Sequence, residues 1–230
     1  MKKHIPNLIT LGNLFCGTIA TIFAVQANYE FAALFVVFGI VFDFFDGFAA
    51  RLLNVSGELG KQLDSLADMV TSGVVPGIIM YHLLDNASSE VSALKYIGLL
   101  LTLGACYRLA KFNIDTRQSD SFIGLPTPAM CLFVIVLPLI QINTGFEFIR
   151  NLMGNPFFLI AVTLLLTLLM NAELPLFSLK FKNYKLQNNL LKYFFLATSL
   201  LMLLLGQYSA IPLVILLYVV LSVVGNLRTK

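Results

Sequence analysis

Four aspartates, placed near the end of one apolar stretch and the start of the next, have the spacing of a metal site. Asp43 and Asp46 are separated by about one helical turn, as are Asp64 and Asp68, so each pair lies on one face of a helix. Four carboxylates that meet away from bulk water cannot all stay ionised without compensating cations. Mg²⁺ and Mn²⁺ prefer oxygen ligands, so we expect two divalent cations about 3.5–4 Å apart, an arrangement that clamps the attacking and leaving oxygens at phosphorus.

Small residues share the acidic helix faces. Gly47 and Ala50 continue the face of the first aspartate pair, and Gly60 precedes the second pair on its own face. Small side chains let a flat nucleotide approach the backbone closely, although close helix packing alone needs them too. Arg51 comes directly after Ala50, and its guanidinium is suited to bind a phosphate. The alternative is that Arg51 only marks the cytoplasmic side of the membrane. The alternative to a metal site is that the aspartates form a partly hydrated cluster at the helix ends, near the membrane interface, with lysines as their partners.

The elements that must position these residues are membrane spans. Of the 230 residues, 58% are hydrophobic and 12% are charged, against roughly half and a quarter in soluble domains. We predict an all-α, polytopic helix bundle in one domain, residues 1–230, with the catalytic part in about 1–130 and additional spans in about 152–225. The eight expected spans are about 6–27, 30–50, 60–84, 93–113, 126–142, 152–170, 190–206 and 208–225.

The distribution of lysine and arginine predicts the orientation. Eight spans place both termini on one side, and that side would carry all but two of the 15 basic residues. By the positive-inside rule this side is cytoplasmic, and the acidic helix ends lie there. Its members are Lys2, Lys3, Arg51, Lys61, Arg108, Lys111, Arg117, Lys180, Lys182, Lys185, Lys192, Arg228 and Lys230, and the other side has Lys95 and Arg150.

The aspartates belong to a longer pattern. From Asp43 to Asp68 the chain reads D-x-x-D-G-x-x-A-R-x8-G-x3-D-x3-D, and it resembles the signature of the CDP-alcohol phosphatidyltransferase family at every fixed position. The segments 5–17, 108–113 and 122–129 are similar to the membrane-embedded phosphatidylserine synthases of that family. Here the chain departs from the pattern at Lys111, where arginine is frequent, and at Met130, where a second alanine is frequent.

The resemblance implies a reaction and roles for the residues. Such enzymes move the phosphatidyl group of CDP-diacylglycerol to a small alcohol, here L-serine, and release CMP. Asp43, Asp46 and Asp64 would be metal ligands, and Asp68 would be the general base and touch a metal as well. The CDP moiety would be contacted by Gly47, Ala50, Arg51 and Gly60. A homodimer in the inner membrane is implied too, with membrane lipids as surroundings and no nucleic-acid partner.

Five further residues are candidates whose roles the sequence leaves open. Thr10 and Asn13 in the first span can hydrogen-bond the CDP-lipid, or they can join helices as polar contacts. Arg108 and Lys111, one helical turn apart, can hold the serine carboxylate or a lipid phosphate, or can be topology signals. Asn113 is a candidate partner for the acceptor's ammonium or hydroxyl.

Two other functions remain open at this stage. Another acceptor of the same family, such as glycerol 3-phosphate, inositol phosphate or a choline-type alcohol, would use the same aspartates. Phosphorylated acceptors need a wider cationic pocket, which favours a small amino acid here. A divalent-cation transporter is the alternative from another class, but its acidic residues are expected near the membrane midplane in repeated halves, and this chain gathers them at one end.

Overall fold

The structure is a computed structural model that describes residues 4–55, 57–87, 93–115, 122–177 and 189–228. These residues are almost entirely helical, as predicted. The basic residues of the expected cytoplasmic side that lie outside the described residues are Lys2, Lys3, Arg117, Lys180, Lys182, Lys185 and Lys230.

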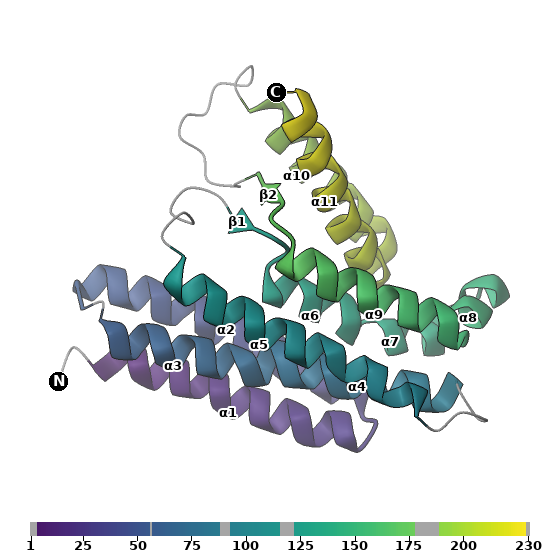
Figure 1. The fold of residues 1–230 in the computed structure, drawn as a ribbon, viewed down its shortest axis with the longest axis horizontal. Helices are drawn as coiled ribbons and strands as arrows, with labels where there is room; N and C mark the ends of the chain where they lie inside the picture. The colour runs from purple at the N-terminus through teal and green to yellow at the C-terminus, as the bar shows by residue number, and fades with distance from the viewer. Residues whose placement is uncertain (1–3, 56, 88–92, 116–121, 178–188, 229–230) are drawn as a thin grey trace.

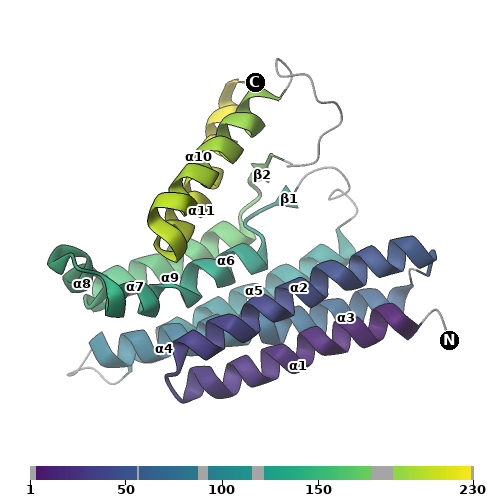
Figure 2. The ribbon, with the colours of Figure 1, turned by 180° about the vertical axis from the view of Figure 1, so that it is seen from behind.

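Four long helical segments lie side by side and form the first layer of the fold (Figures 1 and 2). Consecutive segments run in opposite directions, because each connection between them is short. The layer consists of α1 (Ile5–Val25), α2 (Tyr29–Leu53), α3 (Glu58–Asp68) with η2 (Met69–Val74) and α4 (Val75–Ala87), and η3 (Leu94–Leu99) with α5 (Leu100–Ile114).

The turn between α2 and α3 brings the acidic segments together. Asn54 has a left-handed backbone conformation (φ 52°), and its N–H bonds back to the carbonyls of Ala50 and Arg51, which ends α2. The chain then re-enters a helix at Glu58, so the end of α2 and the start of α3 lie at the same end of the bundle as the N-terminus (Figure 1).

A second group of shorter helices packs against the four-helix layer. It contains α6 (Thr127–Ile135), α7 (Leu137–Asn143), α8 (Glu147–Met153) and α9 (Pro156–Asn171), flanked by the strands β1 (Phe122–Ile123) and β2 (Pro175–Leu176). The two strands pair antiparallel, with Phe122 opposite Leu176. Gly124 follows β1 with a positive φ of 76°, and a side chain there would meet the carbonyl of Met170, so this approach of the chain to the end of α9 requires glycine.

The last two helices form an antiparallel pair that leans away from the rest (Figures 1 and 2). They are α10 (Leu190–Gly206) and α11 (Ile211–Arg228), joined by η5 (Gln207–Ala210). The reversal occurs at Gln207, whose φ of 48° breaks the helix. Most of α10 makes few internal contacts, and Leu200, Leu204 and Leu205 are exposed.

The predicted spans coincide with helical segments, with two differences of length. Among the described residues, five helical stretches are long and apolar enough to cross a membrane, and one of these is Leu190–Asn226. The number is six if a bent pair of helices is counted as one further span. The bent pair is α8 and α9, which meet at 68°, because Pro156 starts a new helix capped by Asn155. The fifth predicted span, 126–142, is a shorter apolar stretch, Thr127–Asn143, interrupted before Pro138.

The side chains are arranged as lipid surroundings require. Large apolar residues such as Phe44 (63% exposed) and Leu204 (72%) face outward, whereas Asn13 (0%) and Arg108 (8%) are buried. This pattern of apolar surface and polar interior, on several apolar spans, is that of a polytopic integral membrane protein.

Candidate active site

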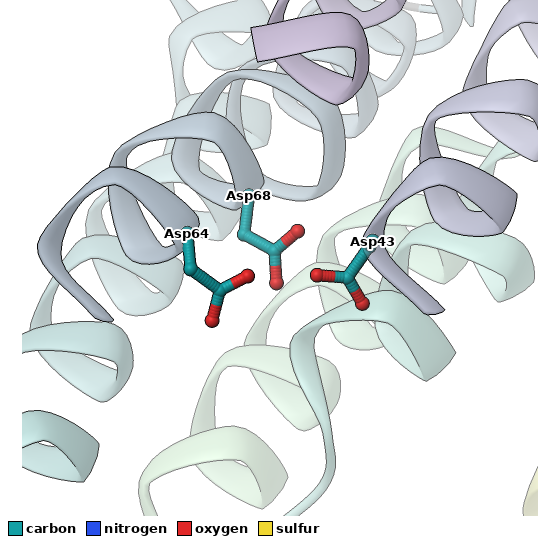
Figure 3. Close-up of side chains that lie close together, drawn as sticks. All are labelled: Asp43, Asp64 and Asp68. Carbon is teal, nitrogen blue, oxygen red and sulfur yellow. The ribbon is translucent and has the colours of Figure 1, made fainter. Parts of the chain in front are cut away.

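Three of the four predicted aspartates meet between α2 and α3. Ligand oxygens of Asp43, Asp64 and Asp68 all lie within 4.8 Å of one another, and all three side chains are half-buried. Figure 3 shows the Asp43 carboxylate, from α2, pointing toward the Asp64 and Asp68 carboxylates, from α3. Three convergent carboxylates are a donor set of hard oxygens, which suits a divalent cation such as Mg²⁺ or Mn²⁺.

Asp46 is one helical turn further along α2 and lies outside the three-carboxylate group. It is buried, and its Oδ2 accepts a hydrogen bond of 2.5 Å from the Thr10 hydroxyl. We predicted that all four carboxylates converge, and three of them do. The fourth, Asp46, is bound by Thr10 of α1. The sequence left two roles open for Thr10: it makes the interhelical contact to Asp46, and it also lines the pocket described below.

Asp68 is held by a chain of two hydrogen bonds. The Asn13 amide Nδ2 donates to Asp68 Oδ1 at 3.1 Å, and the Thr71 hydroxyl donates to Asn13 Oδ1 at 2.8 Å. Both Asn13 and Thr71 are completely buried. The Thr71 bond fixes which end of the Asn13 amide faces Asp68, so Asn13 orients this carboxylate in the structure. Sequence reasoning did not find Thr71, although a threonine one turn after the last aspartate was a visible signal.

Two glycines let α1 and α2 approach Thr71 closely. A side chain at Gly39 would lie 2.7 Å from the Thr71 methyl carbon and 2.8 Å from Asn13 Oδ1, and one at Gly17 would overlap the Thr71 hydroxyl. Thr71 is in η2, a π-helical segment directly after Asp68, and such segments are frequent at functional sites. The local widening of the helix and the two glycines together place the Thr71 hydroxyl against Asn13.

A pocket of about 230 Å³ adjoins the acidic cluster at the end of the bundle. It is formed by the start of α1, the end of α2 and the start of α3. Four of the residues predicted to bind the CDP-lipid, Gly47, Ala50, Gly60 and Thr10, line it, and so do Asp46 and Asp64. Asn7 and Lys61 also line it and were not predicted as site residues.

Gly47 keeps part of this pocket open, since a side chain there would meet nothing within 4 Å. The other two residues predicted to contact the CDP moiety lie elsewhere in the structure. Arg51 is exposed and is not among the residues that line the pocket, and Asn13 is completely buried.

The predicted acceptor residues separate into two groups. Arg108 is buried, donates from Nη1 to the Thr127 hydroxyl at 3.0 Å, and lies near enough to Asp68 to interact with it electrostatically. Lys111 forms an ion pair of 3.3 Å with Glu173. Both line a small pocket between α5 and the end of α9.

Asn113 points elsewhere. Its side-chain Nδ2 donates to the Ser65 hydroxyl at 2.9 Å, and its Oδ1 can accept from the same hydroxyl at 3.2 Å. Its backbone carbonyl accepts a hydrogen bond from Lys61 Nζ. These contacts tie the end of α5 to the start of α3. The structure therefore places Asn113 as a helix-joining residue and leaves it outside the pocket of Arg108 and Lys111.

An apolar, helical chain with clustered carboxylates and a pocket of about 230 Å³ beside them fits a membrane-embedded transferase. Comparison with known proteins gives its family. The sequence profile described as CDP-alcohol phosphatidyltransferase matches residues 3–169, and the chain belongs to this family. Proteins of this family use divalent metals, and the three-aspartate group is where this chain can bind one.

Individual relatives are similar over much of the chain. The CDP-diacylglycerol–serine O-phosphatidyltransferase of Bacillus subtilis is 42% identical over 139 residues, which are 58% of this chain and 75% of the relative. The protein of the same name from Helicobacter pylori strain 26695 is 31% identical over 183 residues, 79% of this chain and 76% of the relative. An archaetidylserine synthase from Methanothermobacter thermautotrophicus is 28% identical over 166 residues, 70% of this chain and 66% of the relative.

Proposed function

We propose that this protein transfers the phosphatidyl group of CDP-diacylglycerol to L-serine and releases phosphatidylserine and CMP. The observation that carries the proposal is the group of Asp43, Asp64 and Asp68, within the family's signature, beside an open pocket of about 230 Å³. The relatives named above as serine O-phosphatidyltransferases support the acceptor.

The aspartates supply the metal ligands and the base. We infer that Asp43, Asp46, Asp64 and Asp68 hold two divalent cations, Mg²⁺ or Mn²⁺, with Asp46 turned by Thr10 toward the nucleotide pocket. When bound, the cations neutralise the pyrophosphate and the charge that develops on the departing CMP. Gly47, Ala50 and Gly60 leave room for the CDP moiety against the backbone, and Arg51 is expected to reach a phosphate from outside the pocket.

The chemical step is a displacement at the phosphorus that carries the lipid. The serine hydroxyl oxygen forms a bond to this phosphorus, the bond from the phosphorus to the bridging oxygen of the pyrophosphate breaks, and CMP leaves with that oxygen. Asp68 takes the hydroxyl proton, and Asn13 keeps its carboxylate directed at the cluster. We infer that Arg108, which interacts electrostatically with Asp68 and lines the small pocket between α5 and the end of α9, holds the acceptor's carboxylate.

The topology of the whole chain is part of the proposal. We expect eight spans in a single domain, with α8–α9 as one bent span and α10 and α11 as two, both termini in the cytoplasm, and the acidic site at the cytoplasmic face of the inner membrane. The bias of lysine and arginine along the sequence supports this orientation. A homodimer with contacts in the later spans would cover part of the exposed leucines of α10.

CMP release tests the proposal. The purified protein in detergent micelles is given CDP-diacylglycerol and Mn²⁺ or Mg²⁺, with L-serine, glycerol 3-phosphate or inositol phosphate as separate acceptors. Release that requires serine, and that stops with a chelator and with Asp68→Asn, is the expected result. Release with a phosphorylated acceptor instead would retain the family chemistry and overturn the serine assignment. Folded protein that releases no CMP with any acceptor would favour a divalent-cation transporter.

A further inference from the structure

The pocket of about 230 Å³ that we propose receives the CDP moiety is lined by a cation that has no assigned role. Lys61 lines it together with Asp46 and Asp64. Among the described residues that line this pocket, Lys61 is the only lysine or arginine, and Arg51 is not one of them. The two carboxylates repel a pyrophosphate, so Lys61 is the side chain in this pocket that can attract one.

Lys61 shares a face of α3 with two of the aspartates. Lys61, Asp64 and Asp68 stand at i, i+3 and i+7, so they follow one another along the helix. At a rise of 1.5 Å per residue, Lys61 is about 4.5 Å from Asp64 and about 10.5 Å from Asp68 along the axis. If Asp68 acts at the phosphorus that carries the lipid, the other phosphate, which leaves with cytidine, lies toward Lys61.

The N-terminus of α3 adds partial positive charge at the same place. Gly57 and Gly60 line the pocket at the start of this helix, and Gly57 gives the helix no side-chain cap. The first N–H groups of a helix have no partner inside the helix, and they favour a nearby anion. Glu58, the acidic residue of the first turn, is exposed and does not line the pocket.

The present contact of Lys61 does not commit it to another role. Its Nζ donates to the backbone carbonyl of Asn113, in the last turn of α5, and this hydrogen bond is exposed. Water can replace the ammonium at an exposed carbonyl, so giving up the bond costs little. A phosphate offers the ammonium a full negative charge instead, and the flexible lysine stem allows the change of partner.

We propose that Lys61 binds the phosphate of the CMP half of CDP-diacylglycerol and holds it as CMP leaves. This inference rests on the proposed function and deepens it. Negative charge grows on this phosphate as its bridging oxygen separates from the phosphorus that carries the lipid. A cation beside it therefore stabilises the transition state and the bound product.

Four variants of the full-length protein separate a charge for the phosphate from a contact between helices. Lys61→Arg keeps the charge and a donor. Lys61→Gln loses the charge and keeps a donor for the Asn113 carbonyl, whereas Lys61→Met loses both. Gln62→Met is the matched control, because Gln62 Oε1 accepts from Asn113 Nδ2 at 3.4 Å and so joins α3 to α5 as well, but Gln62 does not line the pocket.

The measurements are the Kd of CMP, by titration calorimetry of the purified protein in micelles with Mn²⁺, and the KM values of both substrates. We expect Lys61→Gln and Lys61→Met to raise the Kd of CMP and the KM for CDP-diacylglycerol about 10-fold, the loss of one hydrogen bond to a charged group. The KM for L-serine should not change. Lys61→Arg and Gln62→Met should bind CMP as the unsubstituted protein does.

Two results would overturn the inference. If Lys61→Gln binds CMP as tightly as the unsubstituted protein, the positive charge at this position does not hold the phosphate. If Gln62→Met weakens CMP as much as Lys61→Gln does, the effect comes from the junction of α3 and α5. Should Lys61→Met fail to fold, Lys61→Gln carries the comparison, since it keeps a donor for that junction.

Failure of the proposed function gives a different result. In that case the unsubstituted protein would release no CMP from CDP-diacylglycerol and L-serine, whichever residue stands at position 61. Failure of the inference alone leaves serine-dependent CMP release intact and makes CMP binding independent of the charge at that position.

Discussion

The hydrogen bonds from Thr71 through Asn13 to Asp68 predict that two buried residues outside the acidic group control its activity. Asn13→Leu removes a donor to a carboxylate, and such a bond contributes about 1.5–3 kcal/mol, or roughly 10- to 100-fold in rate. Thr71→Val removes a bond between neutral groups, which contributes about 0.5–1.5 kcal/mol, or roughly 2- to 10-fold. Both substitutions keep the number and branching of the side-chain heavy atoms.

The double variant separates an orienting chain from two independent effects. If Thr71 acts only by holding the Asn13 amide, its substitution has no further effect once Asn13 is leucine. We therefore expect the double variant to have the kcat of Asn13→Leu. The assay is CMP release at saturating serine and CDP-diacylglycerol, with the metal concentration varied to detect weakened metal binding.

Thr163→Val is the control for this series. Thr163 is also completely buried, and its hydroxyl bonds to the Leu159 carbonyl within the same helix, away from the aspartates. Its substitution should leave kcat unchanged, whereas Thr71→Ser should retain most of the activity because it keeps the hydroxyl. The reasoning is refuted if the effects of Asn13→Leu and Thr71→Val multiply in the double variant, or if neither changes kcat.

Three further predictions concern the metal, a helix contact and the nucleotide pocket. Removal of divalent cations should abolish CMP release. Adding Mn²⁺ or Mg²⁺ should restore CMP release fully in the unsubstituted protein and only weakly in Asp43→Asn. Full restoration in that variant would exclude Asp43 as a metal ligand. Gly39→Ala should lower both activity and thermal stability because its methyl group overlaps the Thr71 side chain, while Gly145→Ala, with open space around it, should be neutral in the same melting and activity assays. Gly47→Leu should raise the KM for CDP-diacylglycerol at least several-fold, since Gly47 lines the pocket and a Cβ at this position meets nothing within 4 Å; an unchanged KM would place the nucleotide elsewhere.

The helical fold and the acidic site were largely predictable from the sequence. Apolar stretches of spanning length must be helical in lipid, and the spacing of Asp43, Asp64 and Asp68 places them on facing sides of adjacent helices. The break at Pro156 and the short stretch before Pro138 were harder to locate, because hydropathy does not change there.

The contacts of single polar residues could not be predicted in the same way. Thr10 and Asn13 were found as candidates because they are polar residues in an apolar span, but their partners depend on the rotation of α1 against α2 and η2. That rotation is set by Gly17 and Gly39, which carry no chemical signal of their own.

The fold separates the chemistry that any acceptor shares from the contacts that choose one. Displacement at phosphorus needs the same carboxylates and the same nucleotide pocket for every alcohol, and all of these come from α1, α2 and α3. The groups that we propose to face the acceptor come from α5, which carries Arg108 and Lys111 in the small pocket at the end of α9. Gly124 lets the chain pass against the Met170 carbonyl, and the end of α9 lines a small pocket together with Arg108. A change of acceptor is therefore expected to involve α5 and the end of α9 and to leave the acidic motif unaltered.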